Sequence, residues 1–304
     1  MENRTVDLLM GKYESRQFGK LIVIVLAPHS ILTDIGGRYL HVREWAGKGD
    51  TVVLAHGVTG CCHDHTPLAQ RLNEQDYHVL AADAPGCGKS DPSDDEVAGF
   101  GLGAFAADFR MMLDQLAKGP VHWIGASKGG GLGIRLAGEY PQYIKSLLLY
   151  DVGVSLPPQV IGALAKRLTA PPHFATLQEF RSHIARFFER NGCILTSKRL
   201  DEIAIGWSRR MDDGRTTYHY DPRTAFQFSN CPEDFNLMPY WDEIRCPIHV
   251  LRGGNSSILP DGELQDMLTR NSNATARDIA SAVHVNMLDD PSLQDIIIAF
   301  LRQN

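Results

Sequence analysis

Short, wholly apolar segments that alternate with helical periods are the feature that most constrains how this chain folds. Each apolar segment has four to six apolar residues, the length of a strand that is buried on both faces of a sheet. Such segments lie at 51–57, 77–86, 122–127 and 146–153. Helical periods separate them, at 65–74, 103–117 and 129–139. The alternation predicts an α/β fold with a mostly parallel central sheet, right-handed crossovers and helices on both faces.

The alternation stops after residue 153 and resumes at residue 246. The resumed pattern contains apolar strands and helical periods in turn, at 246–254, 261–270, 274–280 and 291–302. The interval between them has helical periods, at 176–190 and 197–211, but no strand–helix rhythm. Long excursions from the edge of a sheet usually shape a binding site. We therefore predict one core, formed by 1–153 and 241–304, with 154–240 inserted as a helical cap and not as an independent domain.

Composition and charge narrow the class of partner. Of the 304 residues, 43% are hydrophobic and 22% are charged, which is ordinary for a globular protein. The net charge of −6 comes without a basic block, so we expect a small-molecule substrate and no nucleic-acid partner. The apolar run within 20–28 is about seven residues long, which is too short to cross a membrane, and its β-branched residues favour a strand. The sequence leaves open whether the protein forms a homo-oligomer.

The cysteines and glycines argue against a metal or a cofactor. The six cysteines, at 61, 62, 87, 193, 231 and 246, form no CxxC pair. They are typical of reduced thiols in a cytoplasmic protein. Two glycine-rich stretches, 86–91 and 99–105, lack the spacing of a phosphate-binding loop and of a dinucleotide fingerprint. We expect neither a bound metal nor a cofactor.

A serine enclosed by glycines follows the third apolar segment. Gly125, Ser127 and Gly129 fit the pattern G-x-S-x-G, with an apolar strand before them and a helical period after them. In that context a sharp strand-to-helix turn lifts the serine hydroxyl clear of the sheet, and small neighbours let the turn close. The N-terminus of the helix also favours developing negative charge. We predict that Ser127 is a nucleophile; the alternative is a structural bend.

One of the twelve histidines stands out by its position. His284 follows the last strand and precedes the final helix, and nucleophile, acid and histidine occur in that order in this constellation. His56 is its rival as the base. Because His56 ends a strand, we expect it to position a substrate-binding loop instead. That loop would supply the backbone N–H of Val58 as one oxyanion donor, and the N–H of Lys128 would be the other.

Together these motifs resemble the α/β-hydrolase fold superfamily, and within it the cap-bearing serine esterases and C–C hydrolases. The matching segments span nearly the whole chain in the family's order, at 54–60, 83–91, 125–130, 150–153, 246–257 and 284–291. The resemblance implies hydrolysis of small esters, lactones, amides or activated C–C bonds without a metal or cofactor. A serine at position 127 separates the chain from the epoxide hydrolases and haloalkane dehalogenases, which use an aspartate there.

The acid of the family's triad is missing from its usual place. The resemblance implies an aspartate soon after the glycines at 253–254, but Ser257 stands where that aspartate is expected. Asp151, at the end of the preceding apolar strand, is one replacement. Asp261 is another, although capping a helix is its plainer role. The third alternative is that no carboxylate is present, which matters because replacing the acid by an amide lowers kcat about 10⁴-fold in such a triad.

The region of 154–240 and the residue after the serine bear on specificity. Lys128 has two interpretations: a cation that holds a substrate carboxylate, or a solvated lysine in the first turn of a helix. We expect Trp207 and Phe187 to line an apolar substrate pocket, while most other aromatic side chains of this region pack within it.

We therefore predict a serine hydrolase that acts on a small carboxylic ester, with Ser127, His284 and Asp151 as its triad. A C–C bond hydrolase or an amide hydrolase of the same fold is the nearest alternative. An alternative of another class is a non-hydrolytic ligand-binding protein or lyase of this fold, which the absence of the usual acid supports.

Overall fold

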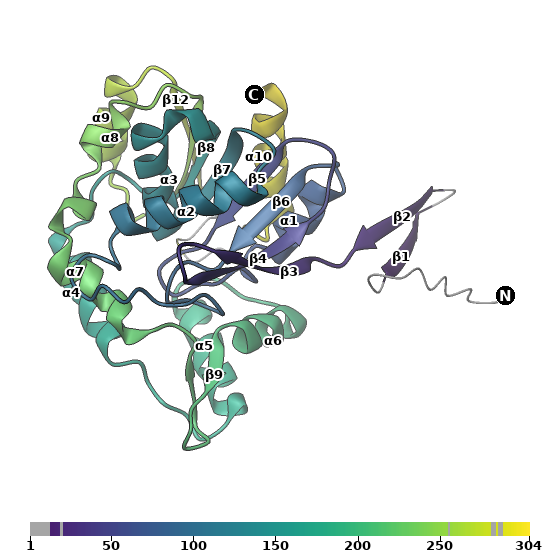
Figure 1. The fold of residues 1–304 in the computed structure, drawn as a ribbon, viewed down its shortest axis with the longest axis vertical. Helices are drawn as coiled ribbons and strands as arrows, with labels where there is room; N and C mark the ends of the chain where they lie inside the picture. Colours follow the sequence, from purple (N-terminus) through teal and green to yellow (C-terminus); the bar gives the residue numbers. More distant parts are fainter. Residues whose placement is uncertain (1–12, 19–20, 255, 281–283, 285–287) are drawn as a thin grey trace.

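A mostly parallel sheet forms the centre of the molecule (Figure 1). The computed structural model describes residues 13–18, 21–254, 256–280, 284 and 288–304. Within these residues the sheet has the strand order β12-β11-β8-β7-β5-β6-β4-β3. Neighbours from β12 to β6 pair in parallel, whereas β4 pairs antiparallel with both β6 and β3. The strands are β3 (His29–Asp34), β4 (Tyr39–Trp45), β5 (Thr51–Ala55), β6 (His78–Ala82), β7 (Val121–Ala126), β8 (Ile144–Tyr150), β11 (Ile248–Gly253) and β12 (Ala274–Ile279).

Helices cover both faces of the sheet, as the sequence predicts. Alternate residues of a strand point to opposite faces. In β5, Val52 and Leu54 pack into one apolar cluster with α1 and α10, and Val53 and Ala55 pack into another with α2, α3 and α9. These helices are α1 (Thr66–Asn73), α2 (Leu102–Leu116), α3 (Lys128–Glu139), α9 (Asp261–Arg270) and α10 (Pro291–Gln303), and a 3₁₀ turn (Pro141–Tyr143) follows α3.

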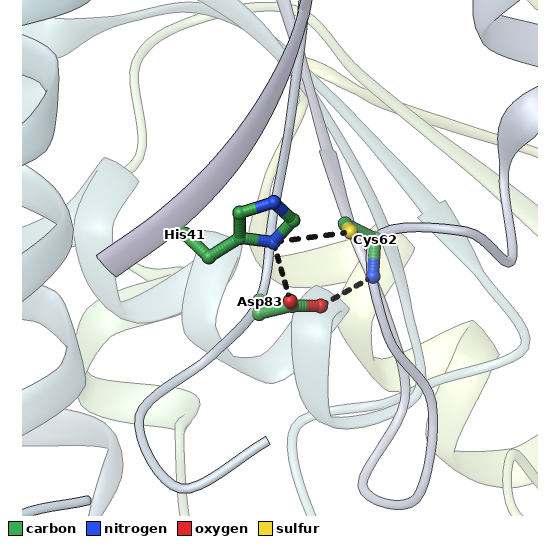
Figure 2. Close-up of side chains that lie close together, drawn as sticks. All are labelled: His41, Cys62 and Asp83. Carbon is green, nitrogen blue, oxygen red and sulfur yellow. Dashed lines mark hydrogen bonds and ion pairs between the residues drawn. The ribbon is translucent and has the colours of Figure 1, made fainter. Parts of the chain in front are cut away.

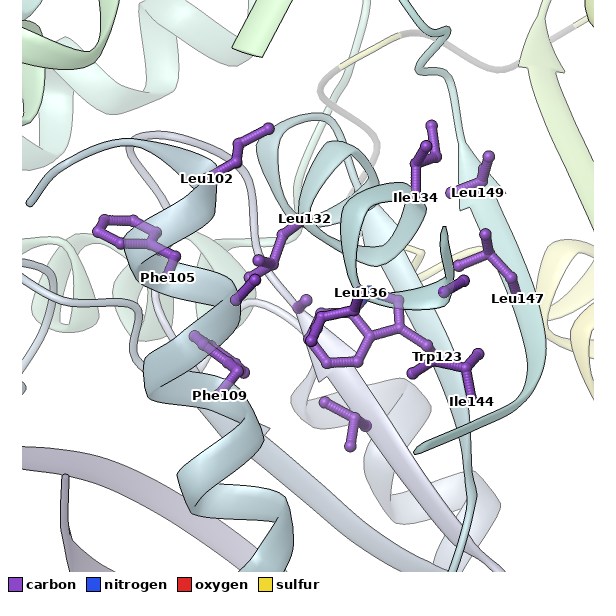
Figure 3. Close-up of a cluster of buried hydrophobic side chains, with 14 of the residues drawn as sticks. Leu102, Phe105, Phe109, Trp123, Leu132, Ile134, Leu136, Ile144, Leu147 and Leu149 are labelled. Carbon is purple, nitrogen blue, oxygen red and sulfur yellow. The ribbon is translucent and has the colours of Figure 1, made fainter. Parts of the chain in front are cut away.

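The larger cluster holds α3 in place beneath the candidate site. Figure 3 shows Trp123 of β7 between the side chains of α2 and α3. Its ring lies 5.6 Å from that of Phe109, centroid to centroid, and its indole N–H donates to the Gly129 carbonyl over 2.9 Å. Trp123 has no exposed surface. The first turn of α3 is therefore fixed to the sheet by both apolar packing and a hydrogen bond.

The segment between β8 and β11 is mainly helical. It contains α4 (Pro158–Thr169), α5 (Leu177–Arg190), α6 (Ser197–Gly206), β9 (Ser208–Arg210), β10 (Thr216–Tyr218), α7 (Phe226–Asn230), α8 (Met238–Trp241) and 3₁₀ turns at Pro222–Ala225 and Pro232–Phe235. Phe180, Ile184 and Phe188 of α5 form a separate apolar cluster with Trp207. Cys61 and Cys87 of the core also belong to this cluster, so the segment packs onto the core. The domain boundaries at 154 and 240 stay a prediction.

Two further elements can be compared with the sequence prediction. The strand expected within 20–28 is confirmed as β2 (Leu21–Leu26), which pairs with β1 (Tyr13–Phe18) in a hairpin apart from the main sheet (Figure 1). The helix expected over 197–211 ends at Gly206, and β9 begins two residues later, at Ser208. None of the helices in the described part is both long and apolar enough to cross a membrane.

Candidate active site

Ser127 occupies a strained turn between β7 and α3. Its φ of 50° and ψ of −120° lie outside the regions that residues other than glycine normally adopt. The backbone here is so close-packed that a Cβ on Gly129 would lie 2.2 Å from the Ala55 carbonyl oxygen, and one on Gly125 would lie 2.3 Å from the Gly129 carbonyl oxygen. The two glycines of the pattern are thus required by steric contact. The strain is the kind that presents a serine at the top of a sheet.

A cavity of about 320 Å³ opens over this turn. Both Ser127 and His284 line it, although they are 157 positions apart in the chain and come from different strand ends. Core and cap segments share its wall, which includes Gly57, Val58, Lys128, Val152, Leu164, Phe187, Trp207, Phe228, Leu237 and Ser257. The wall is largely apolar with fewer polar groups, as in small-molecule sites.

The structure brings Asp151 to His284. The Asp151 carboxylate lies 2.9 Å from the His284 Nδ1. It also accepts a hydrogen bond from the Gly253 N–H over 2.9 Å and one from the Ser256 hydroxyl over 3.0 Å. Burial raises the pKa of Asp151, but these hydrogen bonds, with that of His284 first, outweigh burial and hold the pKa below its usual value. Asp151 is therefore a carboxylate at neutral pH, with no exposed surface.

Asp261 and Ser257 occupy other places. Asp261 begins α9, and its exposed carboxylate forms an ion pair with Arg252. Ser257 is exposed at the cavity wall. Ser256 has a role that no sequence motif indicates: its hydroxyl donates to Asp151 and accepts from the backbone N–H groups of Ile258 and Leu259. In the sequence, only its place in the loop after β11 could have pointed to Ser256, and the neighbouring residues of that loop share this place.

The predicted oxyanion donors face the same cavity. Val58 and Lys128 both line it beside Ser127. Lys128 is the first residue of α3, where N–H groups have no partner inside the helix. Within the described residues, neither backbone N–H donates to a protein acceptor. The Lys128 ammonium lies 4.2 Å from the centroid of the Phe105 ring, so this side chain is not the solvated lysine that its alternative interpretation predicts.

His56 does not line the cavity that contains Ser127. It is buried, and its Nε2 accepts a hydrogen bond from the Ala84 N–H over 3.0 Å. Its Nδ1 must then carry the proton, which it donates to the Gly57 carbonyl over 2.7 Å. Burial lowers the pKa of His56, so the ring is neutral. This geometry holds the loop that precedes Val58, and a role of His56 in substrate binding stays a prediction.

Trp207 and Phe187 both line the cavity, as expected. The Trp207 indole N–H donates to the Asp64 carboxylate over 2.7 Å. Asp64 also accepts from the Cys61 N–H over 3.1 Å. Burial raises the pKa of Asp64 to about 7, against the effect of these hydrogen bonds. Trp207 thereby fastens the segment 154–240 to the loop before α1.

Three buried side chains, His41, Cys62 and Asp83, lie close together on the core side of this loop (Figure 2). The Asp83 carboxylate accepts from the His41 ring over 2.8 Å, from the Cys62 N–H over 2.7 Å and from the Lys89 N–H over 3.0 Å. Burial raises the pKa of the Cys62 thiol, which favours its neutral form. A cation at this place would have to displace these hydrogen bonds and ionise the thiol. The cluster ties together β4, the loop before α1 and the segment after β6.

Comparisons with known proteins bear on the fold and on the class of activity. A family model described as the alpha/beta hydrolase fold matches residues 50–291. The chain is similar to a 3-hydroxybutyrate-oligomer hydrolase from Cupriavidus necator, with 27% identity over 271 residues that cover 86% of this chain and 92% of the relative. It is also similar to a 2-(acetamidomethylene)succinate hydrolase from Mesorhizobium japonicum, with 29% identity over 227 residues that cover 74% of this chain and 78% of the relative.

Solved structures agree on the architecture. An alpha/beta hydrolase from Novosphingobium aromaticivorans superposes with a TM-score of 0.79 and covers 97% of this chain and 100% of its own. Its sequence identity is 23%, so the likeness concerns the fold alone. Function has to be argued from the site.

Proposed function

The chain belongs to the α/β-hydrolase fold family, and from that premise we propose that it is a serine hydrolase of small carboxylic esters. Hydrolase activity is supported by the family and by the relatives. The observation that carries the proposal is the 2.9 Å contact of His284 with Asp151 in a molecule whose strained Ser127 lines the same cavity as His284. A nucleophile, a base and a group that orients the base are the minimum for this chemistry.

In the proposed mechanism Ser127 attacks the ester carbonyl. The Asp151 carboxylate accepts a hydrogen bond from His284 Nδ1–H and so holds the tautomer in which Nε2 carries no proton. Nε2 can then take the proton of the Ser127 hydroxyl. Negative charge then develops on the carbonyl oxygen, where the N–H groups of Val58 and Lys128 stabilise it. His284 next gives its proton to the leaving alcohol. Water repeats the sequence on the acyl-enzyme and releases the acid.

Asp151 also stabilises the charge that His284 acquires during the reaction. The carboxylate stays ionised because its pKa is held below the usual value, and its low exposure strengthens the attraction to the imidazolium. The supporting hydrogen bonds from Gly253 and Ser256 fix its direction. In this proposal the acid of the triad lies at the end of β8 and not in the loop after β11.

An ester is the substrate class that the relatives favour. The relative from Cupriavidus necator is named for 3-hydroxybutyrate oligomers, and hydroxy acids join into oligomers through carboxylic ester bonds. An amide is the second candidate, because the relative from Mesorhizobium japonicum is named for a compound with an acetamido group. The same serine, base and oxyanion donors serve both bonds, so the leaving group distinguishes them.

The test replaces the nucleophile. We expect Ser127→Ala to lower kcat on p-nitrophenyl esters of graded chain length by about 10³-fold or more, since the covalent route is lost. The melting temperature should stay close to that of the wild type, because one hydroxyl is removed. Ser155→Ala is the matched control: Ser155 lines the same cavity away from the turn, and its loss should leave kcat within about twofold. Near wild-type turnover by Ser127→Ala would refute the proposed role.

A further inference from the structure

Lys128 is a cation inside an apolar cavity, next to the nucleophile. Its side chain is partly buried. The residue lines this cavity and also a small neighbouring space whose wall includes Phe105, and the ammonium lies over the Phe105 ring. Among the residues that the structure describes, no hydrogen-bond acceptor or carboxylate pairs with this ammonium. A cation–π contact compensates only part of the cost of removing a charge from water. The ammonium therefore has unused hydrogen-bonding capacity.

The carboxylates of the cavity wall already have other partners. Asp64 accepts hydrogen bonds from Trp207 and from the Cys61 N–H. Asp234 Oδ2 accepts from the Leu102 N–H over 2.7 Å and from Gln227 over 2.8 Å. Its Oδ1 accepts no hydrogen bond within the described residues and lies 3.6 Å from the Arg135 guanidinium. Neither carboxylate is positioned to neutralise Lys128 by contact.

The charge of Lys128 is present under neutral conditions. Burial lowers the pKa of this ammonium to about 8, while Cys87, Asp234 and Cys231 raise it by less. At pH 7 most molecules thus carry the positive charge. A second cation of the wall, Arg167, lies over the Phe187 ring at 5.9 Å, and its side chain is exposed. The cavity is therefore suited to an anion.

We propose that Lys128 binds a carboxylate of the substrate, so that the preferred substrates are esters that carry a free carboxylate beside the reacting bond. The proposal rests on the proposed serine hydrolase function and names its substrate class. A lone ammonium in an apolar wall matches one carboxylate, which it binds through a charge-assisted hydrogen bond. The backbone N–H of Lys128 serves the oxyanion, so one residue would hold both the carboxylate and the reacting carbonyl.

Two matched substrate pairs test the proposal. One pair places the charge on the acyl side: p-nitrophenyl hydrogen glutarate against p-nitrophenyl 4-carbamoylbutyrate. The other places it on the alcohol side: 4-carboxyphenyl butyrate against 4-carbamoylphenyl butyrate. In at least one pair, Lys128→Met should lower kcat/KM for the carboxylate about 10- to 100-fold more than for the carboxamide, mainly through KM. Lys128→Arg should restore most of that ratio.

The control removes an equal charge outside the cavity. Lys166 lies on α4, next to Arg167, is exposed, and does not line the cavity. Lys166→Met should leave both carboxylate-to-carboxamide ratios unchanged. An equal loss on both members of both pairs by Lys128→Met would mean that the side chain only supports the turn, and this would overturn the proposal, as would no loss at all.

A binding measurement separates this proposal from the hydrolase function. Calorimetric titration of the Ser127→Ala protein with glutaramate, which is anionic, and with glutaramide, which is neutral, requires no catalysis. We expect glutaramate to bind about tenfold or more tightly than glutaramide, and the preference to vanish in Ser127→Ala/Lys128→Met. If the wild-type protein hydrolysed no ester but Ser127→Ala still preferred glutaramate, the hydrolase function would be refuted and carboxylate binding by Lys128 would be supported. Equal binding of the two would overturn the anion site.

Discussion

Asp151 reaches His284 from the end of β8, one strand away from the place where the family resemblance implies an acid. The strands β8 and β11 are neighbours, and Tyr150 pairs with Leu251. Both strand ends therefore meet at one edge of the sheet, and the sequence alone left Asp151 and Asp261 as alternatives. A positive φ of 49° at Asp151 is part of the local conformation that distinguishes them, and no sequence pattern specifies it.

Asp151→Asn tests the orienting acid. The asparagine can still accept from the Gly253 N–H, but its NH₂ group then faces His284 and favours the tautomer with the proton on Nε2. We expect kcat to fall by about 10⁴-fold, with a much smaller change in melting temperature. Steady-state kinetics and thermal unfolding measure the two quantities.

Ser256→Ala is the comparison for this variant. It removes one hydrogen bond to the Asp151 carboxylate but leaves the contact with His284 in place. The loss in kcat should be about tenfold or less. Unchanged turnover in Asp151→Asn would remove Asp151 from the mechanism. It would also favour the alternative that the chain is a non-hydrolytic ligand-binding protein or lyase. Ser257→Asp in the Asp151→Asn background tests whether an acid from the loop after β11 restores activity.

Asp64 should give the stability a pH dependence. Its pKa is raised by burial to about 7 in the fold, from an ordinary value of 3.8. The fold thus favours the protonated form, so this contribution to stability is present at low pH and is lost as the pH rises from about 4 to about 7. Relative to Asp64→Asn, the wild-type free energy of unfolding should fall by up to about 4 kcal/mol over that range. Urea unfolding of both proteins at matched pH measures it, and parallel curves would show that Asp64 titrates normally.

At the scale of elements, α6 fastens the inserted segment to the core. Arg199 of α6 forms a 2.7 Å ion pair with Asp289 and also donates to the Asp64 carbonyl. Asp289 lies just before α10, and Asp64 lies just before α1. One arginine therefore joins α6 to both loops that flank the site, and α5 then presents one aromatic face to the cavity.

Phe187→Ala should change the substrate ranking. Phe187 lines the cavity, so its removal enlarges the space for the acyl chain. We expect kcat/KM for long-chain p-nitrophenyl esters to rise by roughly tenfold relative to short-chain esters. Phe180→Leu on the same helix is the control, because Phe180 is fully buried and does not line the cavity. That variant should lose stability and keep the ranking. An unchanged ranking in Phe187→Ala would remove it from the substrate pocket.

For the whole molecule, the central α/β alternation was predictable because each buried parallel strand is a short apolar run. The strands β3 and β4 were not predicted, because their sequences mix polar and apolar residues, as in His29–Asp34. Their pairing is antiparallel and depends on the partner strand. The helix α4 was missed because it buries little: Leu168 is its one fully buried residue in the structure. Lys128 shows the same limit, since the Phe105 ring that its ammonium contacts belongs to α2, another element of the chain.

The most direct test of the central claim is covalent labelling of the full chain with a fluorophosphonate, followed by intact-mass and peptide mass spectrometry. A fluorophosphonate reacts with a serine only when a base activates it and an oxyanion site accepts the phosphoryl oxygen. The account predicts one adduct per chain, located on Ser127, absent from Ser127→Ala and formed at least about 100-fold more slowly in Asp151→Asn. An unlabelled Ser127, or an equally fast adduct in Asp151→Asn, would contradict it.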